Sequence, residues 1–267
     1  MIQLIVSDID GTLLPYGQKQ LDPSTFSLIH RLSQRGIQFC PASGRQFHSL
    51  RKLFGPVQDE LCYLCGNGAI LYGSGTEKAA PILGRTVMEH TPAMGLTQDI
   101  LALEGCEVLI SGANCSYLYQ CDDSFVARMR DGTGNHVRVV HSLEEIEEDI
   151  IKISAYCPAG AAVPEKALGG KWPGIFRMAV AGAEWLDFTL ADKGIGLRQL
   201  CGALGIPLEN TLAFGDNWND LPMLEAAGHP YLMASADPRL AEKLPRQCTS
   251  VPAVLEHLLE TGCLLEC

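Results

Sequence analysis

The chain has 267 residues, of which 47% are hydrophobic and 19% are charged. This length and composition are typical of a folded protein with one large or two medium-sized domains. No segment approaches the roughly 18 to 20 uninterrupted apolar residues of a membrane span, and the first residues have no signal-peptide pattern, so we expect a cytoplasmic protein. The net charge of −11 disfavours nucleic acids and anionic membranes as partners, because both repel an acidic surface.

The first part of the chain alternates between predicted strands and helices. Strands are predicted at 4–8, 37–43 and 61–65, and helices at 22–36 and 45–55. Asp22 or Ser24 is suited to cap the first helix, and Gly36 is suited to end it. Strand–helix–strand units with short connections favour right-handed crossovers, so this part predicts a parallel sheet that helices cover.

The same pattern returns near Lys193, but the middle of the chain differs. After Lys193, helices are predicted at 192–205, 217–228, 237–244 and 251–262, and strands at 211–216 and 230–234. In the middle, strands are predicted at 107–112, 115–120, 136–140, 150–157, 175–182 and 183–190, and helices at 122–132, 142–150 and 163–171. We therefore expect an α/β domain, residues 1–83 plus 186–267, interrupted by an α+β module at 84–185.

Polar side chains follow the carboxyl ends of several predicted strands. In an open α/β sheet these ends form the ligand-binding edge, so we expect the side chains to lie together. The set comprises Asp8, Asp10 and Thr12 after the first strand, Ser43, Gly44 and Arg45 after the second, Asn67 after the third, Asp216, Asn219 and Asp220 after the strand at 211–216, and Lys193 at a helix start.

These residue types favour phosphoryl chemistry. Aspartates crowded at one sheet edge repel one another unless a cation lies among them, and oxygen ligands suit Mg²⁺. Ser43 and the amides that follow it would form an anion-binding nest, and Lys193 would supply a fixed positive charge. A carboxylate can attack phosphorus to form an aspartyl-phosphate. Asp8 is placed for that attack, and Asp10 for moving protons to the leaving group and from water.

Each of these residues also has a structural explanation. An aspartate after a strand commonly caps a helix or forms a turn, and a tight turn accounts for Asn67 nearly as well as a functional role does. The functional interpretation therefore depends on the whole combination. Cys62 and Cys65 form a CxxC pair, but no second pair follows, so we interpret them as buried strand residues and not as zinc ligands.

Four motifs resemble the haloacid dehalogenase superfamily of phosphohydrolases, and most closely its Cof-type members. They are DIDGTLL at 8–14, ASGR at 42–45, Lys193-Gly194 and GDNWNDLPML at 215–224, and GNGA at 66–69 is similar too. The resemblance implies an α/β fold with a Rossmann-like parallel-sheet core and a large inserted α+β cap domain. The cap would close over the site and select a small substrate.

The resemblance also implies a function. The protein would be a Mg²⁺-dependent phosphatase that acts on a small phosphorylated metabolite, such as a sugar phosphate, through an aspartyl-phosphate intermediate. Asp8 would be the nucleophile, Asp10 the acid and base, and Lys193 would stabilise the phosphoryl group. The remaining roles would be metal binding by Asp8, Asp10 and Asp216, phosphate binding by Ser43, Gly44, Arg45 and Asn219, and support by Thr12 and Asp220.

Two other functions stay open at this point. A phosphomutase or phosphotransferase would use the same residues, with a hydroxyl group in place of water as the acceptor. A non-catalytic ligand-binding protein is less favoured, because such a protein is expected to lack the nucleophile or the lysine. The physiological substrate and the oligomeric state cannot be predicted from the sequence. Candidate substrate contacts in the cap are Arg128, Arg130, His136, Lys171 and Trp172, with a solvent-exposed face as the alternative explanation for each.

Overall fold

The computed structural model describes residues 1–133, 136–181 and 183–265, and it divides the chain into two compact units. The first unit comprises Met1–Arg85 and Asp192–Cys267, and the second unit comprises Thr86–Ala191. The second junction lies six residues beyond the expected 185/186, because β11 (Trp185–Thr189) pairs along its whole length with β9 (Ile150–Tyr156) of the second unit. Gly182 of the predicted hairpin lies outside the described residues.

A parallel sheet of order β14-β13-β12-β1-β2 forms the centre of the first unit. β1 (Leu4–Ser7) is fully buried and pairs with β2 (Gln38–Pro41) on one side. On its other side it pairs with β12 (Thr211–Gly215), so that two segments about 200 residues apart in sequence lie side by side. The sheet continues through β13 (His229–Met233) to β14 (Gln247–Cys248). The prediction of a parallel α/β sheet is confirmed.

The third predicted strand belongs to a different sheet. β3 (Tyr63–Cys65) pairs antiparallel with β4 (Ile70–Tyr72), which pairs with β5 (Ile82–Arg85). A parallel bridge between Ala42 and Leu64 nevertheless keeps β3 beside the end of β2, and the Ser43 amide donates to the Leu64 carbonyl over 2.9 Å. The segment after β3 therefore still lies beside the segment after β2.

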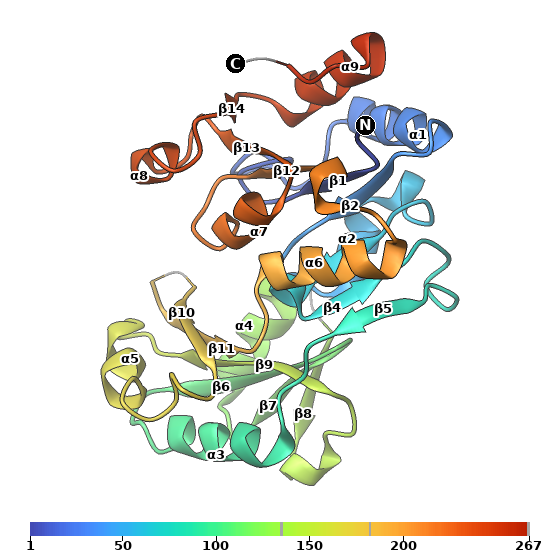
Figure 1. Cartoon of the computed structure of the whole chain (residues 1–267). Helices are drawn as coiled ribbons and strands as arrows, with labels where there is room; N and C mark the ends of the chain where they lie inside the picture. The colour runs from blue at the N-terminus through green and yellow to red at the C-terminus, as the bar shows by residue number, and fades with distance from the viewer. Residues whose placement is uncertain (134–135, 182, 266–267) are drawn as a thin grey trace. The chain divides into compact units, whose positions relative to one another are not determined.

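Helices cover both faces of the parallel sheet. Figure 1 shows α1 (Pro23–Gln34) and α9 (Val251–Thr261) on one face, and α6 (Lys193–Leu204) and α7 (Leu221–Ala226) on the other. Asp22 caps α1, and Gly205 ends α6 in the left-handed conformation at φ 67°. The short helices α2 (Phe47–Leu53) and α8 (Pro238–Ala241) complete this unit.

Three predicted helices have at most half of their expected length, and the one predicted at 237–244 is α8 (Pro238–Ala241). The helix predicted at 217–228 begins only at Leu221, because the Asp220 carboxylate accepts hydrogen bonds from the amides of Asp216 and Asn217 and holds that segment as a turn. The helix predicted at 142–150 is a single 3₁₀ turn, Leu143–Glu145. Its Ser142–Glu145 capping box starts a helix, but Ile146 is already extended and leads into β9.

The second unit is a six-stranded mixed sheet of order β10-β11-β9-β6-β7-β8. Neighbouring strands are antiparallel except for β7 and β8, which run parallel. Its remaining elements are β6 (Glu107–Gly112), β7 (Ser116–Tyr119), β8 (Val137–Val140), β10 (Arg177–Val180), α3 (His90–Leu101), α4 (Asp123–Thr133) and α5 (Ala162–Leu168).

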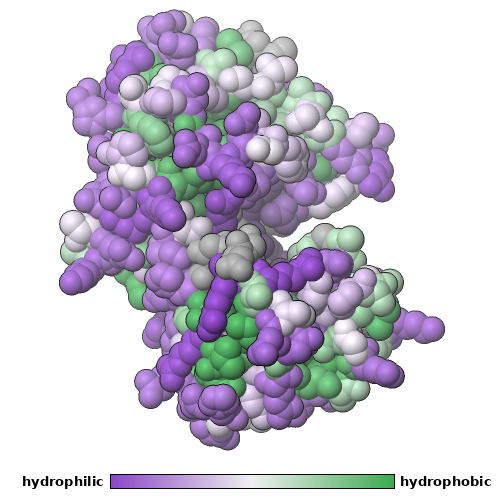
Figure 2. Space-filling view, turned by 180° about the vertical axis from the view of Figure 1, so that it is seen from behind, coloured by the Kyte–Doolittle hydropathy of each residue, from purple (hydrophilic) through white to green (hydrophobic). Residues whose placement is uncertain are grey.

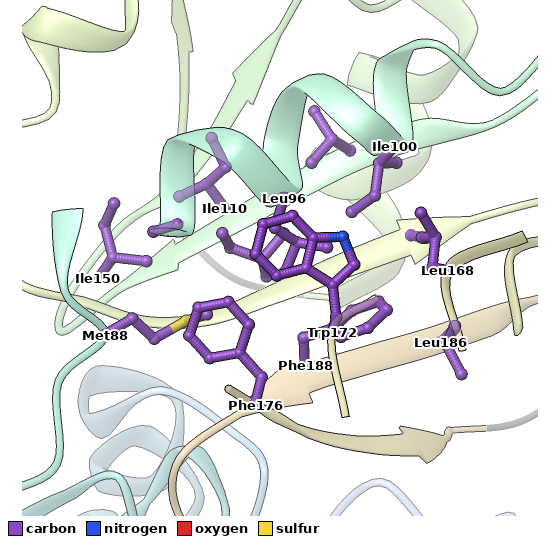
Figure 3. Packing of buried hydrophobic residues seen from close by; sticks show 14 of the residues in the cluster. Met88, Leu96, Ile100, Ile110, Ile150, Leu168, Trp172, Phe176, Leu186 and Phe188 are labelled. Atoms are coloured by element: carbon purple, nitrogen blue, oxygen red, sulfur yellow. The ribbon is translucent and has the colours of Figure 1, made fainter. Parts of the chain in front are cut away.

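Trp172 belongs to the hydrophobic core of the second unit. It is 4% exposed and packs with Phe176, Leu96 and Ile110 between the sheet and α3 (Figure 3). Its indole N–H donates to Asp99 over 2.9 Å. Burial of this size is worth a few kcal/mol. Trp172 is therefore a core residue of the second unit and is not accessible as the substrate contact that was expected.

Two further candidate contacts in the second unit are already engaged within it. Lys171 pairs with Asp99 at 2.6 Å, and Arg128 pairs with Glu184 at 2.6 Å.

The face of the molecule in Figure 2 is largely hydrophilic, with apolar residues in smaller groups. In the described part of the chain, no helix has both the length and the apolar character to cross a membrane.

Candidate active site

Three buried aspartates converge at the carboxyl edge of the parallel sheet. Asp8 follows β1, Asp216 follows β12, and Asp220 lies one turn further along the chain. Because Ser7 and Phe214 are register partners in adjacent parallel strands, the residues that follow them leave the sheet side by side. One carboxylate oxygen from each aspartate lies within 4.8 Å of the other two. The structure thus brings together two distant parts of the sequence.

Lys193 lies among these carboxylates. Its Nζ donates to Oδ1 of Asp8 at 2.5 Å and to Oδ1 of Asp220 at 2.6 Å, and the residue is 1% exposed. Lys193 is the first residue of α6, whose N-cap Asp192 accepts a hydrogen bond from the Ile195 amide at 2.7 Å. The capped start of the helix therefore fixes the direction in which the lysine leaves the backbone.

Burial and charge shift the titration of this cluster. Burial raises the pKa of Asp8 to about 7; the charge of Lys193 opposes this shift, while Asp220 and Asp216 add to it. Burial alone lowers the pKa of Lys193, but the carboxylates of Asp220 and Asp8 raise it more, so the net shift is upward. A cation near Asp8 would favour the ionised form that nucleophilic attack requires.

Asp220 uses both of its carboxylate oxygens within the protein. Oδ1 accepts from Lys193, and Oδ2 accepts from the backbone amides of Asp216 and Asn217, each at 3.0 Å. It therefore orients Lys193 and holds the turn that carries Asp216. A residue with these contacts is better suited to support than to direct metal binding.

Asp216 accepts one hydrogen bond on each oxygen. Thr12 Oγ1 donates to Oδ1 at 3.0 Å, and the Tyr16 hydroxyl donates to Oδ2 at 2.8 Å. The bond to Asp216 is the main cause that raises the pKa of Tyr16 to about 12. A Cβ at Gly11, where φ is 98°, would lie 2.4 Å from Asp216 Oδ2, so only glycine fits there. Tyr16 was not predicted, because no spacing in the sequence points from it to Asp216.

Asp10 and Arg45 form a separate ion pair. Arg45 Nε and Nη2 donate to the two Asp10 oxygens at 3.1 and 2.6 Å. The Asp10 side chain is 51% exposed, whereas Asp8 is buried. The two carboxylates of the DID motif thus have different surroundings: one faces a buried lysine and the other an accessible arginine.

The other predicted residues lie on the neighbouring loops. Ser43 is 4% exposed, and its Oγ accepts the Arg45 amide at 3.2 Å, whereas Gly44 is exposed. Asn219 is exposed in the turn between Asp216 and Asp220. Ser43, Gly44 and Arg45 follow β2, next to β1, so the structure places this loop at the same edge of the sheet as Asp8.

The donor set fits a hard divalent cation. Oδ2 of Asp8 is not the oxygen that Lys193 contacts, and each Asp216 oxygen keeps a lone pair after accepting one hydrogen bond. Among the described residues, Asp8, Asp216 and Asp220 form the one group with metal-binding spacing. Cys62 and Cys65 are buried, and burial raises the pKa of the Cys62 thiol to about 11, in keeping with inert core residues.

Known proteins match nearly the whole chain. A family model described as haloacid dehalogenase-like hydrolase matches residues 5–252. The 5-amino-6-(5-phospho-D-ribitylamino)uracil phosphatase YbjI of Escherichia coli (strain K12) is 26% identical over 244 residues, covering 88% of this chain and 86% of the relative. Pyridoxal phosphate phosphatase YbhA of the same organism is 27% identical over 257 residues, which cover 88% of this chain and 89% of the relative. A solved structure from Eubacterium rectale has a TM-score of 0.87 and is 28% identical; the match covers 96% of this chain and 99% of that chain.

Proposed function

Because the chain belongs to the haloacid dehalogenase-like hydrolase family, we propose that it is a Mg²⁺-dependent phosphatase that hydrolyses small phosphomonoesters through an aspartyl-phosphate on Asp8. The observation that carries this proposal is the contact of buried Asp8 with Lys193 at 2.5 Å, within a cluster of three aspartates. A buried lysine beside a carboxylate nucleophile is suited to hold a phosphoryl group between them.

In the proposed reaction, an Asp8 oxygen attacks phosphorus. The new bond joins phosphorus to Asp8, the ester bond breaks, and Asp10 gives its proton to the departing oxygen. Asp10 then takes a proton from water, which attacks phosphorus and releases phosphate and free Asp8. Lys193 stabilises the charge on the phosphoryl oxygens, and Asp220 orients Lys193 through the 2.6 Å contact.

Asp8, Asp216 and the Asp10 backbone carbonyl would hold the metal, with Thr12 and Tyr16 orienting Asp216. Bound Mg²⁺ would neutralise carboxylate charge and let an anionic substrate approach. This assignment is supported by the oxygen-only donor set.

Phosphate binding is assigned to Ser43, Gly44, Arg45 and Asn219. The Arg45 guanidinium contacts both Asp10 oxygens. A phosphate offers the same bidentate geometry, so the substrate would compete with Asp10 for this group. Release from Arg45 would leave the Asp10 carboxylate free to take up the proton that it then donates to the leaving group.

The proposed substrate is a small phosphorylated metabolite. Both relatives described above are named as phosphatases of such compounds, one a ribitylaminouracil phosphate and one pyridoxal phosphate. We assign substrate selection to the inserted second unit, residues 86–191, whose sequence lies between the two halves of the catalytic unit.

The test is phosphate release from p-nitrophenyl phosphate and a panel of phosphorylated metabolites, with Mg²⁺ or with chelator. We expect activity that requires Mg²⁺ and that Asp8→Asn abolishes. Analysis of products from a hexose phosphate separates hydrolysis from phosphoryl transfer to a second hydroxyl. Pure protein that releases no phosphate from any compound with Mg²⁺ would contradict the proposal.

A further inference from the structure

The turn after β3 contains an asparagine whose side chain is unexplained by the fold. Asn67 lies between Gly66 and Gly68 with φ 55°, in the left-handed region. Asparagine tolerates this conformation better than most residues, so the backbone accounts for an Asn or a Gly here. It does not account for what the carboxamide does.

The oxygen of the Asn67 carboxamide accepts no hydrogen bond from the described residues. Asn67 Oδ1 is buried and has no hydrogen-bond partner within the described parts of the chain. Buried polar atoms are almost always paired, so an unpaired one in a folded protein needs a reason. An asparagine that only shaped the turn would be expected to bond to a nearby backbone group. The carboxamide oxygen is therefore not held in place by a hydrogen bond to its own turn.

Asn67 lies against the proposed phosphate loop. The Asn67 amide donates to the Ser43 carbonyl at 2.9 Å, and the Gly66 amide donates to the Arg45 carbonyl at 3.2 Å. A Cβ added at Gly44 would lie 3.3 Å from Asn67 Nδ2 and 3.5 Å from Oδ1. Residue 44 therefore lies directly beside the Asn67 carboxamide, and a side chain there would contact it tightly.

The same turn also contacts the start of α6. A Cβ at Gly68 would lie 2.3 Å from the Asp192 carbonyl and 3.3 Å from Gly196 Cα. Asp192 immediately precedes Lys193, so the turn is fixed both to the Ser43 loop and to the helix that carries the lysine. Asn67 therefore lies in a turn that contacts two parts of the proposed site.

We propose that Asn67 is a further substrate-binding residue, whose Nδ2 donates a hydrogen bond to a phosphoryl oxygen held by the Ser43–Arg45 loop. The inference rests on the proposed phosphatase function. Phosphate oxygens accept hydrogen bonds, and Nδ2 is the donor of the carboxamide and the atom nearest to residue 44. A neutral donor adds direction without adding charge, which complements the cations Lys193 and Arg45.

Two substitutions separate a binding role from a turn-forming role. Asn67→Gly keeps the left-handed backbone and removes the carboxamide, and Asn67→Asp keeps the shape but replaces the donor with a negatively charged acceptor. Loss of one hydrogen bond to a charged group corresponds to roughly a 10- to 100-fold loss of affinity. We expect the KM for p-nitrophenyl phosphate and the Ki for inorganic phosphate to rise by about this factor in the Gly variant, and further in the Asp variant.

Gln120→Gly is the matched control, because Gln120 is a non-glycine residue with positive φ (50°) in the second unit. Titration calorimetry of inorganic phosphate with Mg²⁺ gives a readout independent of turnover, and melting curves verify folding. If the Gly variant fails to fold, the isosteric Asp variant decides alone. Phosphate affinity within twofold of the control in the folded variants would overturn the inference. A wild-type protein without phosphatase activity would instead overturn the proposed function.

Discussion

At the scale of single residues, the state of Asp8 is central. Its pKa is raised from 3.8 to about 7, mainly by burial. Between these values the folded, metal-free protein keeps a proton that the unfolded chain has released. The free energy of unfolding therefore decreases as pH rises from about 4 through about 7, because deprotonation favours the unfolded state. Above this pH range, where Asp8 is ionised, a bound cation is expected to increase the free energy of unfolding most.

Replacement of Asp8 by asparagine removes this dependence. In chelator, we expect the stability of Asp8→Asn relative to wild type to increase by about 1–3 kcal/mol between pH 5 and pH 8. Thermal unfolding at several pH values measures this difference, with Asp123→Asn, an exposed carboxylate, as the control. A relative stability that stays constant or decreases over this range would contradict the assigned shift.

At the scale of elements, close packing of α6 on the first turn of α7 positions Lys193. A Cβ added at Gly194 would lie 2.4 Å from the Pro222 carbonyl oxygen, which is backbone and cannot rotate away. By contrast, a Cβ at Gly202 in the same helix meets nothing within 4 Å. Gly194 is therefore needed for the close contact between α6 and α7, whereas Gly202 is not, so the two glycines form a matched pair for substitution.

We expect Gly194→Ala to destabilise the protein by about 1–3 kcal/mol through overpacking and to lower kcat by displacing Lys193. Gly202→Ala is expected to stabilise by up to about 1 kcal/mol, because alanine favours the helix. Denaturant unfolding and steady-state kinetics measure both effects. Equal behaviour of the two variants would show that the α6 contact does not position the lysine.

Elements were predictable where local patterns decide them. Asp22 and Gly205 bound their helices as their residue types indicate, and the apolar strand before Asp8 lies in the centre of the sheet. Tertiary contacts decided the exceptions. The Asp220 carboxylate shortens α7, and the antiparallel pairing of β3 with β4 is determined by a turn at Asn67 that periodicity does not reveal.

At the scale of the whole molecule, the chain builds two units with separate hydrophobic cores. Leu4 and Leu197 belong to the core of the first, and Leu96 and Trp172 to that of the second. The family and the carboxylate cluster were predictable from sequence, because several motifs follow the carboxyl ends of predicted strands. The Tyr16–Asp216 contact was not predictable, because it depends on how a loop folds back over another strand.

The measurement that tests the central claim most directly is detection of the covalent intermediate. Wild-type protein is mixed with p-nitrophenyl phosphate and Mg²⁺, quenched in acid within the first turnover, and digested for mass spectrometry. We predict one added phosphoryl group on Asp8, present only with Mg²⁺ and absent in Asp8→Asn. Turnover without any modification of Asp8, or with a phosphoryl group on another residue, would contradict the account.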